Sequence, residues 1–308
     1  MPSFASDVKN ALARTDTERV CCQTAELAAL LRMGASMVTD GGQGLGLRFE
    51  AASAAVARRV IRLLRTMDTA IETSVAMERT PQLRRRTYIV NIAAGEAVTP
   101  LLTRLGLHDG TAVTGTDMEL LRKKCCRAAY LRGAFLGGGS VNRPEASCHL
   151  EIAAKSAAMG RALHMLLRRL HFPVGLTDRR DTYVVYLKEG DAVMDFLALI
   201  GAEEAAEEIE VARNLKEVRA QVNRLVNVET ANLQRAVDAA ADQLAAIERL
   251  ARSGRLAALP ADLRETAEMR RAHPEISMAE LAALCHISKS GMSHRLRKIR
   301  KAAEEETD

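Results

Sequence analysis

Basic residues gathered near the carboxyl end of the chain have the chemistry of an anion-binding surface. From Lys289 to Lys301 the sequence holds six lysines and arginines, one histidine and no acidic residue. The first cation falls in the opening turn of a predicted helix, where the helix dipole disfavours positive charge. A solvated basic helix end is the alternative interpretation, but it does not explain why a lysine lies in the first turn. Double-stranded DNA supplies a reason, because its phosphates attract lysine and arginine.

A pair of short helices joined by a tight turn is predicted to present these cations. Ser277 and Glu280 have the spacing of a capping box, at the start of a helix that should end near Leu284. Ser288 is expected to cap a second helix that runs from Lys289 to about Ala303. An earlier helix should begin at Pro260 and stop before Pro274.

The turn between the two helices is expected at 285–287. It lacks the glycine that many such turns contain, so His286 or Cys285 should adopt the left-handed conformation. The residues expected to face inward are Leu281, Ala282 and Leu284 on the first helix, Ile287 in the turn, and Met292, Leu296 and Ile299 on the second. This arrangement is a helix-turn-helix.

In a helix-turn-helix the amino-terminal half of the second helix enters the major groove of DNA. On that geometry the residues expected to face base edges are Lys289, Ser290, Ser293, His294 and Arg297. The residues expected to meet phosphates are Ser288, Arg295, Lys298 and Arg300.

Cysteine thiols are the second group of residues with reactive chemistry, and the chain has six: Cys21, Cys22, Cys125, Cys126, Cys148 and Cys285. The adjacent pairs lack the C-x-x-C spacing of zinc ribbons and redox motifs. In a reducing cytoplasm they are interpreted as small apolar core residues, with a metal or redox role as the less favoured alternative. The sequence therefore predicts no metal site and no cofactor.

Composition and charge set limits on the class of protein. A chain of 308 residues can form two or three domains, and 48% hydrophobic with 27% charged residues is ordinary for a globular protein. The net charge of +5 permits an anionic partner without requiring one. No apolar run reaches 18 residues and the first 24 residues do not resemble a secretory signal, so we expect a cytoplasmic protein without a membrane partner.

The amino-terminal two thirds of the chain contain an internal duplication. Residues 21–37 align with 125–141 at an offset of 104, with six of 17 positions identical, both cysteines among them. Residues 47–65 align with 150–168 at an offset of 103, with nine of 19 identical. A third block, 87–92, aligns with 182–187 in the same order, which makes chance a poor explanation.

Each repeat is predicted to fold as αββαββα, an α+β unit. In the first repeat we expect helices at 23–34, 53–66 and 96–105, and strands at 35–39, 45–50, 70–76 and 86–92. In the second we expect helices at 127–137, 155–170 and 190–200, and strands at 139–142, 148–153, 173–177 and 182–188.

The first helix of each repeat is rich in small residues, which would let the two helices pack closely. The positions without bulk are Ala28, Ala29 and Gly34 in one helix and Gly133, Ala134 and Gly138 in the other. A phosphate cradle at 137–139 is the alternative, but no Lys-Ser/Thr follows as a P-loop requires. We therefore expect an interface between the two lobes.

Residues 202–254 are predicted to form a helical linker that is interrupted at 223–232. Two valines and three asparagines in those ten residues suggest a break or a packed contact, or else a DNA contact through Asn223, Arg224 and Asn227. Beyond it, an apolar stripe is expected from Val237, Leu244, Ile247 and Leu250.

The duplicated unit resembles the LAGLIDADG homing-endonuclease fold, and residues 131–139 lie over the nine-letter motif. In those nucleases an acid at the eighth position binds the divalent metal that activates water. Here the eighth position is Gly34 in the first repeat and Gly138 in the second. Because glycine offers no oxygen ligand, we expect a nuclease-derived scaffold that is not an enzyme. The alternative hypothesis is an active metal-dependent endonuclease.

A degenerate LAGLIDADG domain followed by this helix-turn-helix is similar to the WhiA family of sporulation and cell-division regulators. The supporting stretches are 125–136, 183–190, 223–232 and 287–299. The resemblance implies two lobes at 1–110 and 111–203, a helical linker at 204–257 and a DNA-binding domain at 258–308.

The same resemblance carries expectations about cellular function. It implies transcriptional control of genes for cell division, the cell cycle, chromosome segregation and sporulation, association with the nucleoid, and no small-molecule substrate. It also implies that a WhiB-type iron–sulfur regulator is a partner of some members. A third hypothesis, compatible with the first, is that the two-lobed domain binds another regulatory protein.

Overall fold

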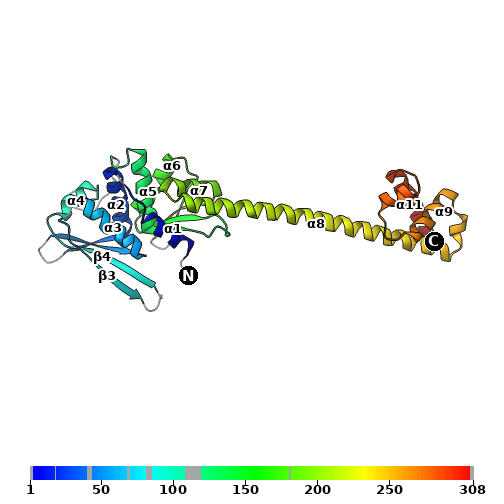
Figure 1. Ribbon diagram of the computed structural model, residues 1–308, viewed down its shortest axis with the longest axis horizontal. Coiled ribbons are helices and arrows are strands. Elements are labelled where there is room, and N and C mark those ends of the chain that lie inside the picture. The colour runs from blue at the N-terminus through cyan, green and yellow to red at the C-terminus, as the bar shows by residue number, and fades with distance from the viewer. Residues whose placement is uncertain are drawn as a thin grey trace. The chain divides into compact units, whose positions relative to one another are not determined.

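The computed structural model describes residues 3–17, 19–39, 44–67, 70–80, 85–107, 119–179 and 182–305 (Figure 1). The chain forms two compact units, one from Met1 to Leu215 and the other from Lys216 to Asp308. Each unit has its own hydrophobic core. No helix in the described part of the chain is long and apolar enough to cross a membrane.

The amino-terminal unit contains the αββαββα order twice, as predicted. The first lobe consists of α2 (Val20–Gly34), β1 (Ala35–Thr39), β2 (Leu45–Ala51), α3 (Ala54–Met67), β3 (Thr73–Thr80), β4 (Arg85–Ile92) and α4 (Val98–Arg104). The second consists of α5 (Lys124–Gly138), β5 (Gly139–Val141), β6 (Leu150–Ala154), α6 (Ala157–Arg169), β7 (Gly175–Arg179), β8 (Thr182–Leu187) and α7 (Gly190–Ile200). A further helix, α1 (Phe4–Leu12), precedes both lobes and was not predicted.

Both lobes build the same antiparallel sheet. The strand order is β1-β2-β4-β3 in the first and β5-β6-β8-β7 in the second. Phe49 on β2 pairs with Val90 on β4, and the equivalent Ile152 on β6 pairs with Val185 on β8. All four side chains are buried, so the duplication preserves the register and the core face together.

Helices α2 and α5 pack against each other between the lobes, and they lie side by side in Figure 1. A Cβ atom at Gly133 would overlap the carbonyl oxygen of Glu26, and one at Gly137 would lie 2.5 Å from Cβ of Met33. Neither position has room for a Cβ atom, so glycine at both positions permits α2 and α5 to pack this closely. The predicted interface of small residues is confirmed.

The linker is a single helix, α8 (Glu203–Arg252), and the predicted interruption at 223–232 is wrong. Those ten residues are helical and exposed, so they form neither a break nor a packed contact. Valine and asparagine each disfavour a helix by only a few tenths of a kcal/mol, and the strong helix formers around them prevail. Val237 is also exposed, at 54%, whereas Ile247 and Leu250 are buried as predicted.

The carboxy-terminal unit packs the end of α8 against a short 3₁₀ helix and three α-helices. These elements are η2 (Arg255–Ala258), α9 (Ala261–Ala272), α10 (Met278–Leu284) and α11 (Lys289–Glu304). Leu281, Met292 and Ile299 lie in its core, as predicted. Leu284 does not, because its side chain is 47% exposed and Cys285 is buried in its place. The helix nevertheless ends at Leu284 and the turn begins at Cys285, as predicted.

Candidate nucleic-acid interface

Local hydrogen bonds fix the start of α10 as the sequence predicts. Ser277 Oγ accepts from the Glu280 amide at 3.2 Å, and Glu280 Oε2 accepts from the Ser277 amide at 2.8 Å. These two bonds complete the capping box. The backbone hydrogen bond from Ser277 favours the ionised carboxylate and lowers the pKa of Glu280.

A tight turn at 285–287 connects α10 to α11. His286 has a φ of 54°, which confirms the prediction of a left-handed residue in this glycine-free turn. Ser288 then caps α11 by accepting from the Gly291 amide at 3.1 Å. Met292, Leu296 and Ile299 are buried on one face of α11, so the opposite face of the helix lies toward solvent.

The outward face of α11 carries most of the predicted contact residues. The exposed members are Ser288, Lys289, Ser290, Ser293, His294, Arg297, Lys298 and Arg300. Arg297 Nη2 lies 3.2 Å from His294 Nδ1, which brings two of the predicted base-reading side chains together. No acidic residue occupies the first turn of α11. The cations of this face are therefore not neutralised by a carboxylate in that turn.

Two of the predicted residues are paired with carboxylates. Arg300 Nε lies 3.6 Å from Glu304 Oε1 on the exposed surface of α11, whereas Arg295 is held against a different helix. The Arg295 guanidinium lies 3.6 Å from Asp262 Oδ2 and 3.9 Å from Glu265 Oε2, both on α9, and its side chain is half-buried. Arg295 Nη1 also donates to Thr266 Oγ1 at 3.4 Å. The structure thus places Arg295 between α11 and α9, where its charge is already paired.

A buried arginine of α9, which the sequence analysis did not predict, makes hydrogen bonds inside the carboxy-terminal unit. Arg270 on α9 is 2% exposed and donates to Gln243 Oε1 on α8 at 3.0 Å and to the Ile276 carbonyl at 2.7 Å. Burial lowers the pKa of Arg270. These hydrogen bonds connect α9 to α8 and to the segment that leads into α10.

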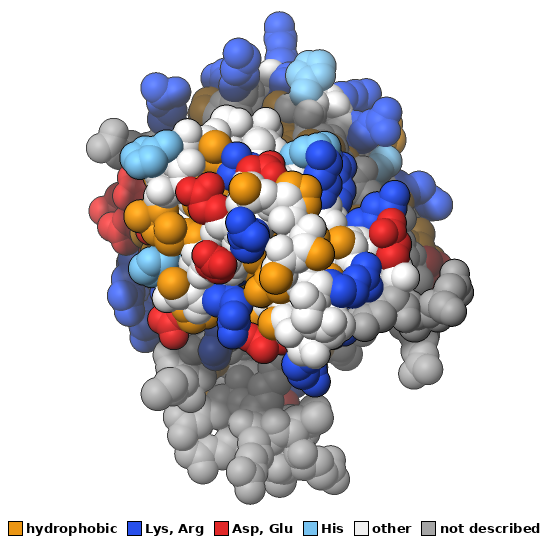
Figure 2. Space-filling model, turned by 90° about the vertical axis from the view of Figure 1, so that its right-hand side faces the viewer, with side chains coloured by type: hydrophobic (Ala, Val, Ile, Leu, Met, Phe, Trp, Pro, Cys, Tyr) orange, Lys and Arg blue, Asp and Glu red, His pale blue; other side chains and the backbone are white. Residues whose placement is uncertain are grey.

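Charge is not segregated over every part of the surface. Acidic and basic side chains are interspersed on the face that Figure 2 presents, with apolar side chains between them. The absence of acidic residues between Lys289 and Lys301 is therefore a local feature of α11 and not of this face as a whole.

The two glycines at the eighth motif position leave no space for a carboxylate. Gly34 ends α2, and a Cβ atom there would lie 2.7 Å from Cε2 of Phe49. Gly138 ends α5, and a Cβ atom there would overlap the Ala153 carbonyl oxygen and the end of Met33. Because the obstacle at Gly138 includes backbone, an aspartate would need the strand to move.

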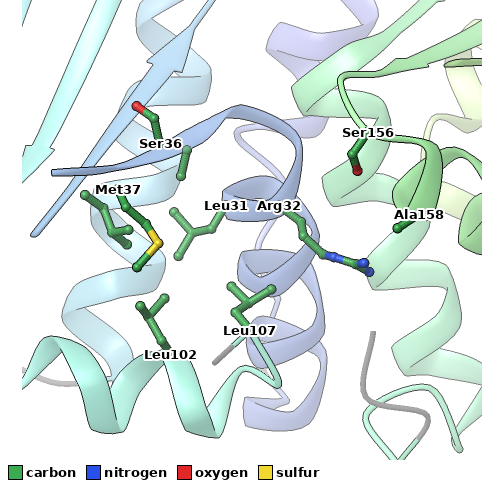
Figure 3. A pocket seen from close by; sticks show the side chains of 10 residues that line it. Leu31, Arg32, Ser36, Met37, Leu102, Leu107, Ser156 and Ala158 are labelled. Carbon is green, nitrogen blue, oxygen red and sulfur yellow. The ribbon is translucent and has the colours of Figure 1, made fainter. Parts of the chain in front are cut away.

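A pocket of about 370 Å³ lies at the junction of α2 and β1 (Figure 3). Figure 3 shows the guanidinium of Arg32 reaching toward Ser156 and Ala158 of the second lobe. The described residues that line the pocket are Leu31, Arg32, Ala35, Ser36, Met37, Leu47, Leu102, Leu107, Ser156 and Ala158. None of these is a carboxylate, histidine or cysteine, so this lining offers no metal ligand of the usual kinds and no general base.

An ion network joins the two lobes in the interior and was not predicted. Glu26 on α2 is fully buried and accepts from Arg59 Nε on α3 at 2.7 Å and from Arg132 Nε on α5 at 2.9 Å. Arg132 also donates to the carbonyl of Ile200 at 3.2 Å. Arg132 is the one charged residue of the motif segment 131–139, and that was the available signal.

The two cysteine pairs meet at the amino-terminal ends of α2 and α5. The Sγ atoms of Cys21, Cys22, Cys125 and Cys126 all lie within 4.8 Å of one another. A hydrogen bond from Cys22 lowers the pKa of Cys125 to about 7, whereas burial raises the pKa of Cys22 to about 11 and that of Cys126 to about 12. The C-x-x-C spacing concerns cysteines that are close in sequence, and it does not detect two pairs that meet from different helices. The duplication together with the helix packing could have predicted their meeting.

Family models match almost the whole chain. The WhiA N-terminal LAGLIDADG-like domain matches residues 20–108, the WhiA LAGLIDADG-like domain matches 127–219, and the WhiA C-terminal HTH domain matches 222–303. A solved structure of full-length DUF199/WhiA from Thermatoga maritima has the same fold, with a TM-score of 0.61 at 23% identity over 99% of both chains.

Curated relatives align along their full length. The "Probable cell division protein WhiA" of Heliobacterium modesticaldum is 40% identical, covering 98% of this chain and 96% of the relative. The protein of the same name from Desulforamulus reducens is 42% identical, covering 98% of this chain and 95% of the relative. Together with the three family models, these matches show that the chain belongs to the WhiA family.

Proposed function

We propose that this chain is a sequence-specific DNA-binding regulator of transcription, with α11 as the helix that enters the major groove. The observation that carries the proposal is the exposed face of α11, whose cations begin at Lys289 in the first turn. A helix in this position of a helix-turn-helix places its first two turns against base edges.

The proposed contacts divide into two classes by position. Lys289, Ser290, Ser293, His294 and Arg297 lie toward the first half of the helix and are proposed to face bases. Ser288, Lys298 and Arg300 are proposed to meet phosphates and to set the register. We leave Arg295 out of the interface, because its pairing with α9 would have to be broken first.

The regulated genes are proposed from the family. Relatives of this chain are named probable cell division proteins, so we propose that it controls cell division, with chromosome segregation and sporulation as further processes. It would then act in the cytoplasm at the nucleoid. A WhiB-type iron–sulfur regulator is the protein partner that the family resemblance implies.

Mapping of bound DNA across the genome of the organism that encodes the chain tests this proposal. We expect enriched fragments upstream of cell-division genes to share one short sequence motif. Transcript levels of those genes should change when the chain is depleted. Fragments without a common motif, or a motif far from any affected gene, would contradict a regulator.

We also propose that the chain does not cleave DNA. Glycine at both eighth positions supports this, because the metal that activates water needs oxygen ligands there. Incubation of the full chain with supercoiled plasmid and Mg²⁺ tests the alternative of an active endonuclease. We expect no nicked or linear product, and Mg²⁺-dependent nicking that follows the protein through purification would favour the endonuclease.

A further inference from the structure

The four thiols at the lobe interface form the one group of three or more close metal-ligating side chains among the described residues. Two come from α2 and two from α5, and the duplication makes the pairs equivalent. Cys148 and Cys285, the two remaining cysteines, lie outside the group. The site therefore depends on both lobes being in place.

The spacing of the sulfur atoms fits a single ion bound by four thiolates. A zinc–sulfur bond of about 2.3 Å in a tetrahedron places neighbouring sulfurs about 3.8 Å apart. The present upper limit of 4.8 Å is within reach of that value through side-chain rotation alone. An iron–sulfur cluster would hold the four cysteine sulfurs farther apart. In such a cluster the four cysteines are distributed over two or four iron atoms instead of sharing one ion.

The charges around the thiols suit an anionic metal centre. A centre of four thiolates and one divalent cation has a net charge of about −2. Both pairs lie in the first turn of a helix, where the helix dipole favours negative charge, and neither first turn contains an acidic residue. The residues that precede the pairs are Arg19, Lys123 and Lys124, which supply positive charge.

Burial distinguishes a structural site from a catalytic one. Cys22 and Cys126 are buried, while Cys21 and Cys125 are half-buried and so remain partly accessible to solvent. Four protein ligands complete a tetrahedron and leave no open position for water or substrate. An ion held in this way would link α2 to α5 and hold the two lobes together.

We propose that Cys21, Cys22, Cys125 and Cys126 form a structural site for one soft divalent cation, with Zn²⁺ as the ion that fits. The site is separate from the proposed DNA contacts on α11. It can therefore be tested without DNA, and its failure would leave the proposed regulator untouched.

The test uses the full chain, purified without a metal-binding tag under reducing conditions. Metal is removed with a chelator, and Zn²⁺ or Co²⁺ is then added back. The readouts are metal bound per chain, the visible spectrum of thiolate-bound Co²⁺, thiol reactivity and the unfolding temperature. The variant Cys21→Ser with Cys126→Ser removes one ligand from each helix. Cys148→Ser is the matched control, because Cys148 is a half-buried thiol of the same unit outside the group.

We expect one ion per chain, a tetrahedral Co²⁺ spectrum, protection of four of the six thiols, and a higher unfolding temperature with Zn²⁺. The double variant should lose all four properties, and Cys148→Ser should keep metal binding. If the double variant does not fold, Cys125→Ser alone must lose the Co²⁺ spectrum. Absence of bound metal, binding that survives the loss of ligands, two disulfides, or iron with inorganic sulfide would each overturn the proposal.

Discussion

Glu26 carries its charge in the centre of the amino-terminal unit, where Arg59 and Arg132 surround it. The carboxylate joins three helices, α2, α3 and α5, and Arg59 Nη1 donates onward to the Thr15 carbonyl at 2.6 Å. A buried ion pair adds little net stability over an apolar core, but removal of one partner leaves an unpaired buried charge. This residue is therefore a sensitive test of the lobe interface.

Glu26→Gln should destabilise the amino-terminal unit by about 3–5 kcal/mol, because the buried Arg59 and the part-buried Arg132 lose their counter-charge. All four tyrosines lie between Tyr88 and Tyr186, so tyrosine fluorescence during urea unfolding reports this unit alone. Asp16→Asn is the control. It removes an exposed partner of Arg62 at 3.4 Å and should cost less than about 1 kcal/mol. Equal effects of the two variants would contradict the role of the network.

Two neighbouring residues of α11 should have separable effects on DNA binding. Arg297→Ala should weaken binding to the best site by about 1–3 kcal/mol and relax the preference at one base pair. Lys298→Ala should weaken all sequences alike and reduce the slope of log affinity against log salt by about one. Binding of a set of operator variants at several salt concentrations measures both. Unchanged relative affinities for Arg297→Ala would contradict its assignment to a base.

At the scale of elements, the close contact between α5 and the second sheet limits which residues can replace Gly138. Gly138→Asp should destabilise the amino-terminal unit by about 1–3 kcal/mol, since its Cβ atom would overlap the Ala153 carbonyl oxygen. Gly95→Asp is the matched control, because nothing lies within 4 Å of a Cβ atom there. Urea unfolding measures the stability. A stable Gly138→Asp protein that nicks plasmid with Mg²⁺ would contradict the close packing described here.

The start of α10 should respond to pH through Glu280. The folded state lowers the pKa of this carboxyl, so its contribution is present above the ordinary glutamate pKa and is lost as pH falls through the lowered value. Hydrogen exchange of α10 in the full chain should be slower for the native protein than for Glu280→Gln near neutral pH. The difference should vanish in acid. A difference that grows in acid would contradict the capping role.

The elements themselves follow largely from local sequence. Capping residues such as Ser277 and Ser288, and the left-handed His286, were predictable because they depend on neighbours a few residues away. The continuity of α8 was not, because weak unfavourable propensities at 223–232 are outweighed along a 50-residue helix. Leu284 was misplaced since periodicity fixes a face only to within about one residue in a helix of seven.

Contacts between distant parts of the chain were harder to predict. The meeting of Cys21 with Cys125, and of Glu26 with Arg59, depends on which helices cross and at which residue. Hydrophobic periodicity predicts that α2 and α5 have packing faces, but it does not give the register between them. The duplication restricts that register, because equivalent positions of two repeats must meet near their shared axis.

At the scale of the whole molecule, each unit has a role that can be separated in experiment. The amino-terminal unit has the LAGLIDADG-like fold without carboxylates at the eighth motif positions, and the carboxy-terminal unit exposes the cationic face of α11. The central claim is that this face, and not the overall positive charge, binds DNA. Variants that change the same net charge in different places distinguish the two.

The most direct measurement is the affinity of the full chain for a duplex recovered by genome-wide mapping. Arg297→Glu with Lys298→Glu reverses two charges on α11, and Arg161→Glu with Arg168→Glu reverses two exposed charges on α6. We predict that the α11 variant loses at least about 100-fold in affinity at physiological salt, because a base contact and a phosphate contact are both removed. The α6 variant should bind nearly as tightly as the native chain. Equal losses for the two variants, or no loss for either, would contradict the account.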